Sequence, residues 1–225
     1  MRIVSKRTVE LAEEIPVYDL TSPRHHNFAI GNGVIVHNCK QKRDKSFQAV
    51  YPLRGKPLNV MDAAKDKVNS NAEVVGLLAA LGVDLSGRKA NVDAAYGKII
   101  LMADADVDGS HISTLVLAIL YRFMPNLLRD GRVYSVQSPL FKAKHKGQVY
   151  FGMTQEEVWK KAGTKVDLTY LKGWGEINPD DLSVALRPDM RTLIRIEDAD
   201  SKGKRAFEQL LGKSGAFRKK LFGIE

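Results

Sequence analysis

Three aspartates alternate along the stretch DADVDG, residues 104–109. They directly follow the apolar run KIILMA, residues 98–103, which is typical of a buried strand. Carboxylates held close together repel one another unless a cation neutralises them, and oxygen is the ligand that Mg²⁺ prefers. The pattern therefore predicts a metal site, most simply for Mg²⁺, that presents the ion to phosphate.

Two other interpretations of the acidic stretch can be weighed from the residues. A calcium EF-hand loop also begins D-x-D-x-D-G, but it needs a glutamate at its twelfth position, where this chain has Leu115. It also needs a preceding helix, whereas a strand is expected here. Alternatively, the aspartates form a turn and a helix N-cap that backbone N–H groups satisfy. Three in alternation after a buried strand favour the metal site.

A second reactive stretch is His37-Asn38-Cys39, which contains the only cysteine of the chain. Cysteine is the strongest nucleophile among the side chains, and the amide of Asn38 can attack its own carbonyl and break the following peptide bond. His37 can polarise that carbonyl or protonate the leaving nitrogen. The stretch thus predicts a self-processing junction, with an unreactive loop as the alternative.

Charge and composition bound the class of protein. The 225 residues carry a net charge of +9, with 35 Lys and Arg against 26 Asp and Glu. Residues 1–38 hold equal numbers of basic and acidic residues, so the excess lies in 39–225, where it suits either nucleic acid or a solvated basic tail. One cysteine excludes a disulfide framework. No run has the length of a membrane span, and no signal peptide is evident, so we expect a cytoplasmic protein without membrane contact.

Apolar periodicity predicts the elements that position these residues. In residues 1–38 we expect short strands with a hairpin turn at 31–33, followed by a basic, turn-rich segment over 39–59. Beyond that segment, the expected elements are a helix over 61–81 with a capping box from Ser70 to Glu73, a strand over 98–103, a helix over 112–127 ended by Gly131, strands over 132–144 and 148–152, and a helix over 154–163. A strand, loop, helix and strand in this order predict a parallel α/β unit, whose chemistry lies at the carboxyl ends of the strands.

Five motifs in order carry a resemblance to a known family: PLRGKPLNV, ADADVDGSHI, LYRFMP, GRVYSVQSPLFK and KGWGEINPDDL. Together they resemble the Toprim and C-terminal region of B subunits of type II DNA topoisomerases, the DNA gyrase and topoisomerase IV group. The resemblance implies a Rossmann-like Toprim domain with a parallel sheet over 39–150 and a gyrase B-type C-terminal region over 151–225. Two departures are Ala103, where the family usually has threonine, and Leu171, where it has tyrosine.

The same resemblance implies roles for individual residues. Mg²⁺ at the DNA cleavage centre would be held by Asp104, Asp106 and Asp108, and DNA would be contacted by Arg54, Lys56 and Lys172. The attacking tyrosine would come from the partner A subunit, and ATP would bind an upstream region that this chain lacks. The family also needs a glutamate in a motif like E-G-D-S-A-G-G just before Lys40, and that motif is absent.

Residues 17–39 are similar to the C-terminal end of an intein, in the blocks VYDLT…HNF and GVIVHN followed by cysteine. This implies a small all-β, Hint-type fragment over 1–38, with splicing residues Asp19, His26, His37, Asn38 and Cys39. The N-terminal nucleophile and the Thr-x-x-His block of inteins are not in the sequence. We therefore expect a split intein whose partner chain carries the N-intein, the ATPase region and the glutamate.

Two competing functions remain at this point. One is another Toprim enzyme, such as a primase or an OLD-type nuclease. The other is an inactive DNA-binding module that keeps the basic surface without the metal. The motifs SPLFK and KGWGEINP favour the topoisomerase.

Overall fold

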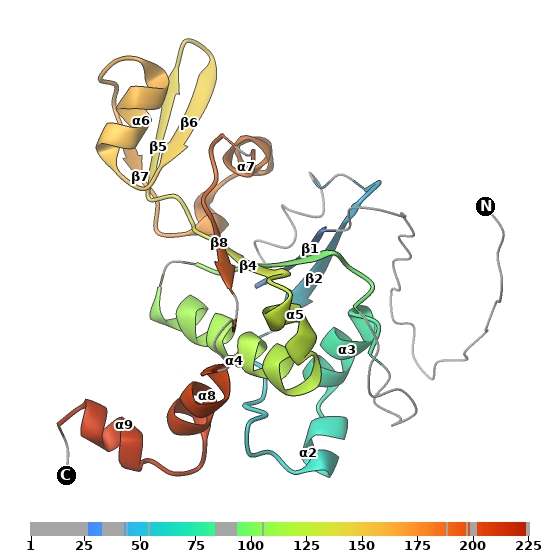
Figure 1. The fold of residues 1–225 in the computed structure, drawn as a ribbon. Coiled ribbons are helices and arrows are strands. Elements are labelled where there is room, and N and C mark those ends of the chain that lie inside the picture. Colours follow the sequence, from blue (N-terminus) through green and yellow to red (C-terminus); the bar gives the residue numbers. More distant parts are fainter. Residues whose placement is uncertain are drawn as a thin grey trace, which may run out of the picture.

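A computed structural model gives the fold of the chain (Figure 1). It describes the backbone of residues 27–32, and residues 43, 45–53, 55–83, 94–104, 106–187, 189–196, 198 and 202–223. Within these ranges, no helix is long and apolar enough to cross a membrane.

The main sheet has five strands in the order β2-β1-β3-β4-β8. Their bounds are β1 Asn27–Asn32, β2 Gln48–Leu53, β3 Lys98–Met102, β4 Val133–Val136 and β8 Leu193–Ile196. The first four strands are parallel, and β8 pairs antiparallel with β4 at the edge. The predicted parallel sheet is found in the first four strands, and the whole sheet is mixed because the chain returns from the second lobe to pair along β4.

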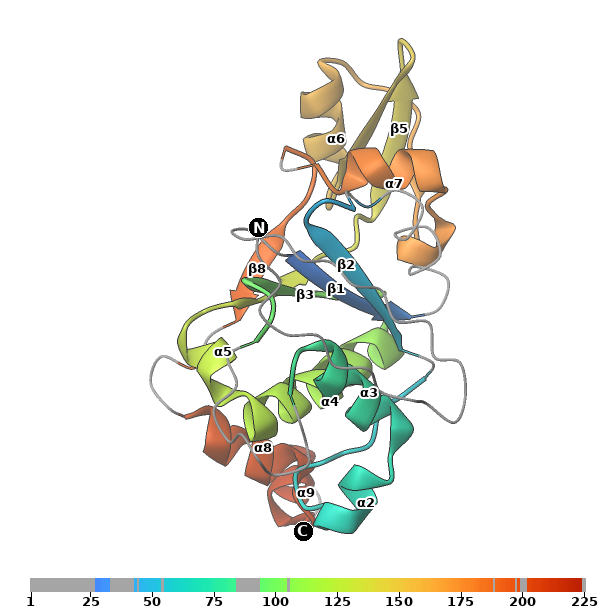
Figure 2. The same cartoon turned by 90° about the vertical axis from the view of Figure 1, so that its right-hand side faces the viewer.

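Helices cover one face of this sheet (Figure 2). They are α2 Lys65–Asn69, α3 Ala72–Ala80, α4 Val107–Phe123 and α5 Pro125–Arg129. Ile99 and Leu101 of β3 point into an apolar cluster with residues of α3 and α4, among them Leu77 and Ile119, and all four are buried. The strand predicted at 98–103 and the apolar helix face that follows it are confirmed.

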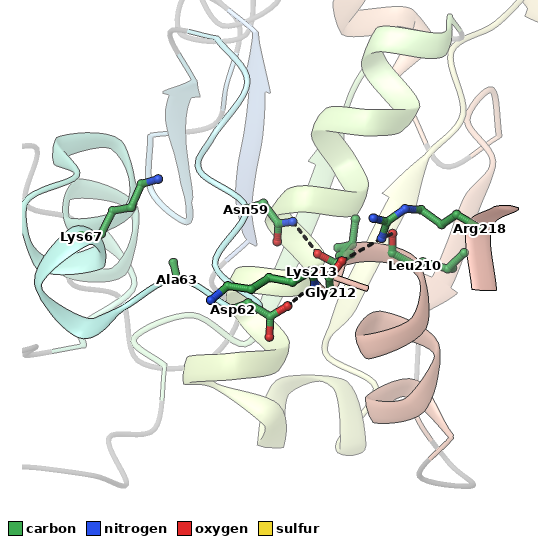
Figure 3. Close-up of a pocket in the computed structure, with 9 residues that line it drawn as sticks. Asn59, Asp62, Ala63, Lys67, Leu210, Gly212, Lys213 and Arg218 are labelled. Carbon is green, nitrogen blue, oxygen red and sulfur yellow. Dashed lines mark hydrogen bonds between the residues drawn. The ribbon is translucent and has the colours of Figure 1, made fainter. Parts of the chain in front are cut away.

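The C-terminal helices α8 Gly203–Leu211 and α9 Ala216–Leu221 lie on the same side of the sheet as α2 and α4 (Figure 2). The rings of Tyr121 and Phe207 are 5.1 Å apart between centroids. Asn59 Nδ2 donates to Leu211 O at 2.7 Å, beside a cavity of about 340 Å³ (Figure 3). This contact ties the C-terminal end to the segment that follows β2.

A second lobe lies against the other face of the main sheet. It consists of an antiparallel sheet, β6-β5-β7, and of helices α6 and α7 with the 3₁₀ turn η1. The bounds are β5 Phe141–His145, β6 Gln148–Gly152, α6 Gln155–Ala162, β7 Thr169–Tyr170, η1 Trp174–Glu176 and α7 Pro179–Ala185. Met102 of β3 joins Phe151, Trp174 and Leu182 in a second buried cluster. The predictions of a strand at 148–152 and a helix at 154–163 are confirmed.

Three predicted elements are divided in the structure. The helix predicted over 61–81 is two helices, and the N-cap of α3 is Asn71, whose side chain accepts from Val74 N at 3.0 Å, so the capping box from Ser70 was wrong. The helix over 112–127 breaks at Met124, because the next residue is Pro125. The strand over 132–144 divides at residues 137–140, which leave one sheet for the other, and a strand, β2, lies in the segment expected to be turn-rich.

The N-terminal segment differs most from expectation where it is described. Gly31 and Asn32 extend strand β1, which pairs in parallel with β2 and β3, so the turn predicted at 31–33 is not formed at these two residues. The reason is that β2 offers backbone groups along all of β1, and β3 does so from Asn27 to Gly31. The boundary placed at residue 38 stays a prediction, and the other expected strands of 1–38 lie outside the described residues.

Candidate functional site

The candidate site lies at the carboxyl end of β3. Met102 ends the strand, and Asp104 follows two residues later, half-buried. Asp104 Oδ1 accepts the backbone N–H of Trp174, at 2.8 Å from the nitrogen. Because β1 is parallel to β3 and adjacent to it, β1 ends with Asn32 at the same edge of the sheet.

The second aspartate caps a helix. Asp106 Oδ1 accepts from Gly109 N at 2.7 Å, which makes Asp106 the N-cap of α4. The helix begins at Val107, so Asp108 lies in its first turn rather than in the loop predicted over 104–109. The cap alternative raised from the sequence thus describes Asp106, because its carboxylate satisfies an N–H group that has no partner within the helix.

The third aspartate forms an ion pair. Lys56 Nζ lies 2.6 Å from Asp108 Oδ1, and the two side chains are 48% and 71% exposed. The hydrogen bond and the charge of Lys56, with a smaller contribution from the charge of His111, hold the pKa of Asp108 below its ordinary value despite a slight opposing effect of burial. The first turn of α4 therefore carries a carboxylate that is ionised at neutral pH.

The three carboxylates suit Mg²⁺ in chemistry but do not converge as a set. Within the part of the chain that the structure describes, no group of three His, Cys, Asp or Glu side chains could hold a metal ion. Magnesium takes one or two protein carboxylates and completes its shell with water or phosphate. One or two carboxylate oxygens at this edge are therefore enough, in chemistry and in number, for such an ion.

Comparison with known proteins identifies this region. Residues 35–137 match the Toprim domain family, and that range includes β2, β3, α4 and the acidic loop between them. The part of the chain that holds β2, β3 and α4 is thus similar to Toprim domains. The main sheet is longer than the matched range, since β1 lies before residue 35 and β8 lies after residue 137.

Curated relatives extend the similarity beyond the Toprim domain. The B subunit of DNA gyrase from Thermus thermophilus is 40% identical over 192 residues, which cover 81% of this chain and 30% of the relative. The corresponding protein of Thermotoga maritima is 36% identical over 189 residues, with the same coverage. That of Synechocystis is 36% identical over 221 residues, 94% of this chain and 20% of the relative. The chain is thus homologous to a region of the gyrase B subunit and spans less than a third of its length.

The structure brings only some of the predicted site residues together. Lys56 reaches the acidic loop of the Toprim domain through Asp108, 52 positions along the chain. Lys172 is exposed on the turn that contacts Asp104. The remaining predicted residues lie outside the described residues: Arg54 for DNA, and Asp19, His26, His37, Asn38 and Cys39 for splicing.

Sequence reasoning missed the buried residues of the second lobe next to the site. Trp174 and Leu171 are buried in the second cluster, so the departure of Leu171 from the family pattern places an apolar side chain in a core. Asp181 is also buried and accepts from Lys142 Nζ and from Asn178 Nδ2. The order of SPLFK and INPDD along the chain was visible, but their contact across 39 positions was not.

Proposed function

We propose that the chain is a fragment of the B subunit of a type II DNA topoisomerase that holds Mg²⁺ at the DNA cleavage and religation centre. The observation that carries this proposal is the acidic loop at the carboxyl end of β3, in a Toprim domain homologous to that of the gyrase B subunit. Asp104, Asp106 and Asp108 are the proposed ligands. The ion would stabilise charge on the scissile phosphate and on its leaving oxygen.

The other partners follow from this role. Lys56, Arg54 and Lys172 would bind DNA phosphates, and Lys56 would exchange its contact with Asp108 for one with the backbone of DNA when the ion arrives. The attacking tyrosine would belong to an A subunit, and ATP would bind a region outside residues 1–225. DNA and an A subunit are therefore the expected partners of the assembled enzyme.

The N-terminal segment is proposed to act as the C-terminal part of a split intein. Cys39 Sγ attacks a thioester at an upstream junction, so the acyl group moves to Cys39 and the upstream thiol leaves. The amide nitrogen of Asn38 then attacks its own backbone carbonyl, which breaks the bond to Cys39 and frees residues 1–38 with a terminal succinimide. The new amine of Cys39 takes the acyl group from sulfur and restores its thiol. His37 donates the proton to the leaving nitrogen, and Asp19 and His26 tune the thiol.

One comparison supports a segment of this kind. The match to the Synechocystis protein covers 94% of this chain, so fewer than 38 residues are left unmatched. Part of the segment 1–38 therefore lies within that match. Coverage of 81% in the other two relatives is low enough to omit it. These coverages are compatible with a segment that only some gyrase B proteins carry, as an inserted, removable element would be.

Splicing would also change the sheet. Strand β1 lies within residues 1–38 and between β2 and β3, so its release would open the position next to the acidic loop. We propose that a strand of the spliced-on partner chain then takes this position. It would bring the family's glutamate to the edge where β1 now ends at Asn32.

The test has two parts, which examine splicing and metal chemistry separately. Peptide mass analysis of the protein from its natural source should find Cys39 joined to a sequence outside this chain, and residues 1–38 released. The spliced product, assembled with an A subunit, should cleave DNA in the presence of Mg²⁺. Asp106→Asn should abolish cleavage, whereas Asp167→Asn, an exposed carboxylate of the second lobe, should not. Cleavage by the unspliced chain with an A subunit would contradict the need for splicing.

A metal-free DNA-binding module is the second candidate, because no three carboxylates of the described residues converge and Lys56 neutralises Asp108. In that case Asp106→Asn would leave DNA binding unchanged, and Mg²⁺ would have no effect on it. Salt dependence would then be the main property of binding.

A further inference from the structure

Asp104 is enclosed by two glycines from different parts of the chain. Gly109, in the first turn of α4, lies so close that a Cβ atom there would come within 2.3 Å of Asp104 O. Gly173 lies in the turn before η1, where a Cβ atom would come within 2.4 Å of Asp104 Oδ1. Real Cβ atoms do not approach other atoms so closely, so any side chain at either position would displace Asp104 or its neighbour.

The turn that contains Gly173 is anchored on both sides. Leu171 N donates to Leu140 O at 2.8 Å, and Lys172 N donates to Glu176 Oε2 at 3.0 Å. Trp174 is 1% exposed and packs in the same buried cluster as Met102, two residues before Asp104. One cluster thus holds both the end of β3 and the turn that faces it.

The contact between the two parts is directional. Trp174 N donates to Asp104 Oδ1, and a hydrogen bond to a carboxylate is stronger than one between neutral groups. It selects one orientation of the carboxylate, and the indole is fixed by burial even though its Nε1 finds no partner among the described residues. A buried polar atom without a partner costs stability, so the gain from the apolar indole body must exceed that cost.

We propose that Gly173 and Trp174 are positioning residues that orient the Asp104 carboxylate toward the metal of the proposed function, on which this inference rests. Gly173 permits the approach, and the Trp174 amide fixes the carboxylate by occupying Oδ1. With Oδ1 held in this way, the turn that contains Gly173 also fixes the direction in which Oδ2 of Asp104 points. Partners of this kind behind a metal ligand typically alter metal affinity by about 10- to 100-fold.

The first experiment measures the contact without metal. Amide hydrogen exchange by NMR on the full chain should show the Trp174 N–H protected, and Asp104→Ala should accelerate its exchange by at least about tenfold. The indole N–H of Trp159 serves as an internal reference, because Trp159 Nε1 donates to Val166 O at 3.0 Å within the second lobe. Unchanged exchange of Trp174 in Asp104→Ala would overturn the inference, whatever the metal does.

The second experiment measures the consequence for metal. Mn²⁺ replaces Mg²⁺ as a paramagnetic probe, and its broadening of amide signals near residue 104 gives a dissociation constant. Gly173→Ala should raise that constant by about tenfold with a similar melting temperature. Gly215→Ala is the matched control, since the nearest atom to its added Cβ is Arg218 Nη2 at 3.9 Å.

The outcomes separate the two hypotheses. Equal Mn²⁺ affinity in wild type and Gly173→Ala would overturn the positioning role and leave the proposed function intact. In a second outcome, Mn²⁺ does not broaden the signals near residue 104 of the wild type, while the exchange of the Trp174 amide still depends on Asp104. This result would overturn both metal binding by this chain and the role of the turn in it. Weaker Mn²⁺ binding in Gly173→Ala, with unchanged binding in Gly215→Ala, supports the inference.

Discussion

Different kinds of interaction stabilise the packing on the two faces of the main sheet. The helix-covered face is an apolar cluster of residues such as Leu77, Ile99 and Ile119, each fully buried. On the other face, Trp174 and Phe151 of the second lobe are buried with Met102 of β3. That lobe also contains the ion pair of Lys142 with Asp181, and its Trp174 N donates to Asp104 Oδ1. Apolar packing is tolerant of small adjustments, whereas a hydrogen-bonded carboxylate has one correct geometry.

This difference assigns a task to each face. The helix-covered face provides the stability of the domain, since buried apolar area is the main favourable term in folding. The lobe-covered face sets where one carboxylate of the candidate site points. Substitutions on the two faces should therefore differ in what they change, and the following predictions are arranged by the size of the expected effect.

The largest effect is expected on the helix-covered face. Ile119→Ala should lower the free energy of unfolding by about 4 kcal/mol, because it removes a fully buried side chain and leaves a cavity. Urea unfolding followed by circular dichroism measures the change. Ile194→Ala, at a position 45% exposed on β8, is the control and should cost less than about 1 kcal/mol. Similar costs at both positions would contradict the assignment of stability to the helix-covered face.

A slightly smaller loss of unfolding free energy is expected from a substitution in β1, a central strand of the main sheet. Ala29→Pro should cost about 3 kcal/mol, because it removes a backbone N–H within β1, which pairs on both sides with β2 and β3. Ala29→Ser keeps the N–H group, so it should cost less than Ala29→Pro. Thermal unfolding measures both variants. If Ala29→Pro unfolds at the same temperature as the wild type, then β1 is not a central strand of the folded sheet.

The two predictions concern elements that differ in how far they could be predicted from the sequence. The apolar pattern of residues 98–127 was enough to predict that β3 is followed by a helix, because each element depends on neighbours within a few positions, but α4 begins at Val107, five residues before the predicted start, and takes in Asp108. The break at Met124 was encoded by Pro125 and could have been anticipated. The place of β1 could not, because parallel pairing is decided by strands about 20 and 70 positions away.

The candidate site was predicted in the same uneven way. The alternation of Asp104, Asp106 and Asp108 was visible, but their separate partners were not, since Trp174 and Lys56 reach them across 70 and 52 positions. Nothing local in KGWGE indicates that Gly173 must lack a side chain. That requirement arises only when Asp104 is placed against it.

A third prediction concerns the lobe-covered face. Lys142→Met should cost about 2 kcal/mol, because it leaves the buried Asp181 carboxylate with Asn178 as its remaining side-chain donor. The double variant Lys142→Met with Asp181→Leu should recover most of that loss, since no buried charge is then left alone. Urea unfolding of the single and double variants gives the coupling. Hydrogen exchange should locate the effect in α7, and a loss spread evenly over α3 and α4 would contradict the independence of the two faces.

The smallest effect on stability is expected at the exposed ion pair, where the change should be in charge. The pKa of Asp108 lies below its ordinary value because of Lys56, so this pair stabilises the fold above that ordinary value and ceases to do so as the pH falls through the lowered pKa. Lys56→Met should raise the pKa of Asp108 toward its ordinary value, as measured by NMR titration of its carboxyl carbon. The melting temperature at neutral pH should not change measurably, because both side chains face solvent. Lys65→Met, an exposed lysine at the start of α2, should leave the titration of Asp108 unaltered. An unchanged Asp108 titration in Lys56→Met would show that the pair is not formed in solution, and Lys56 would then be available to DNA without first leaving a carboxylate.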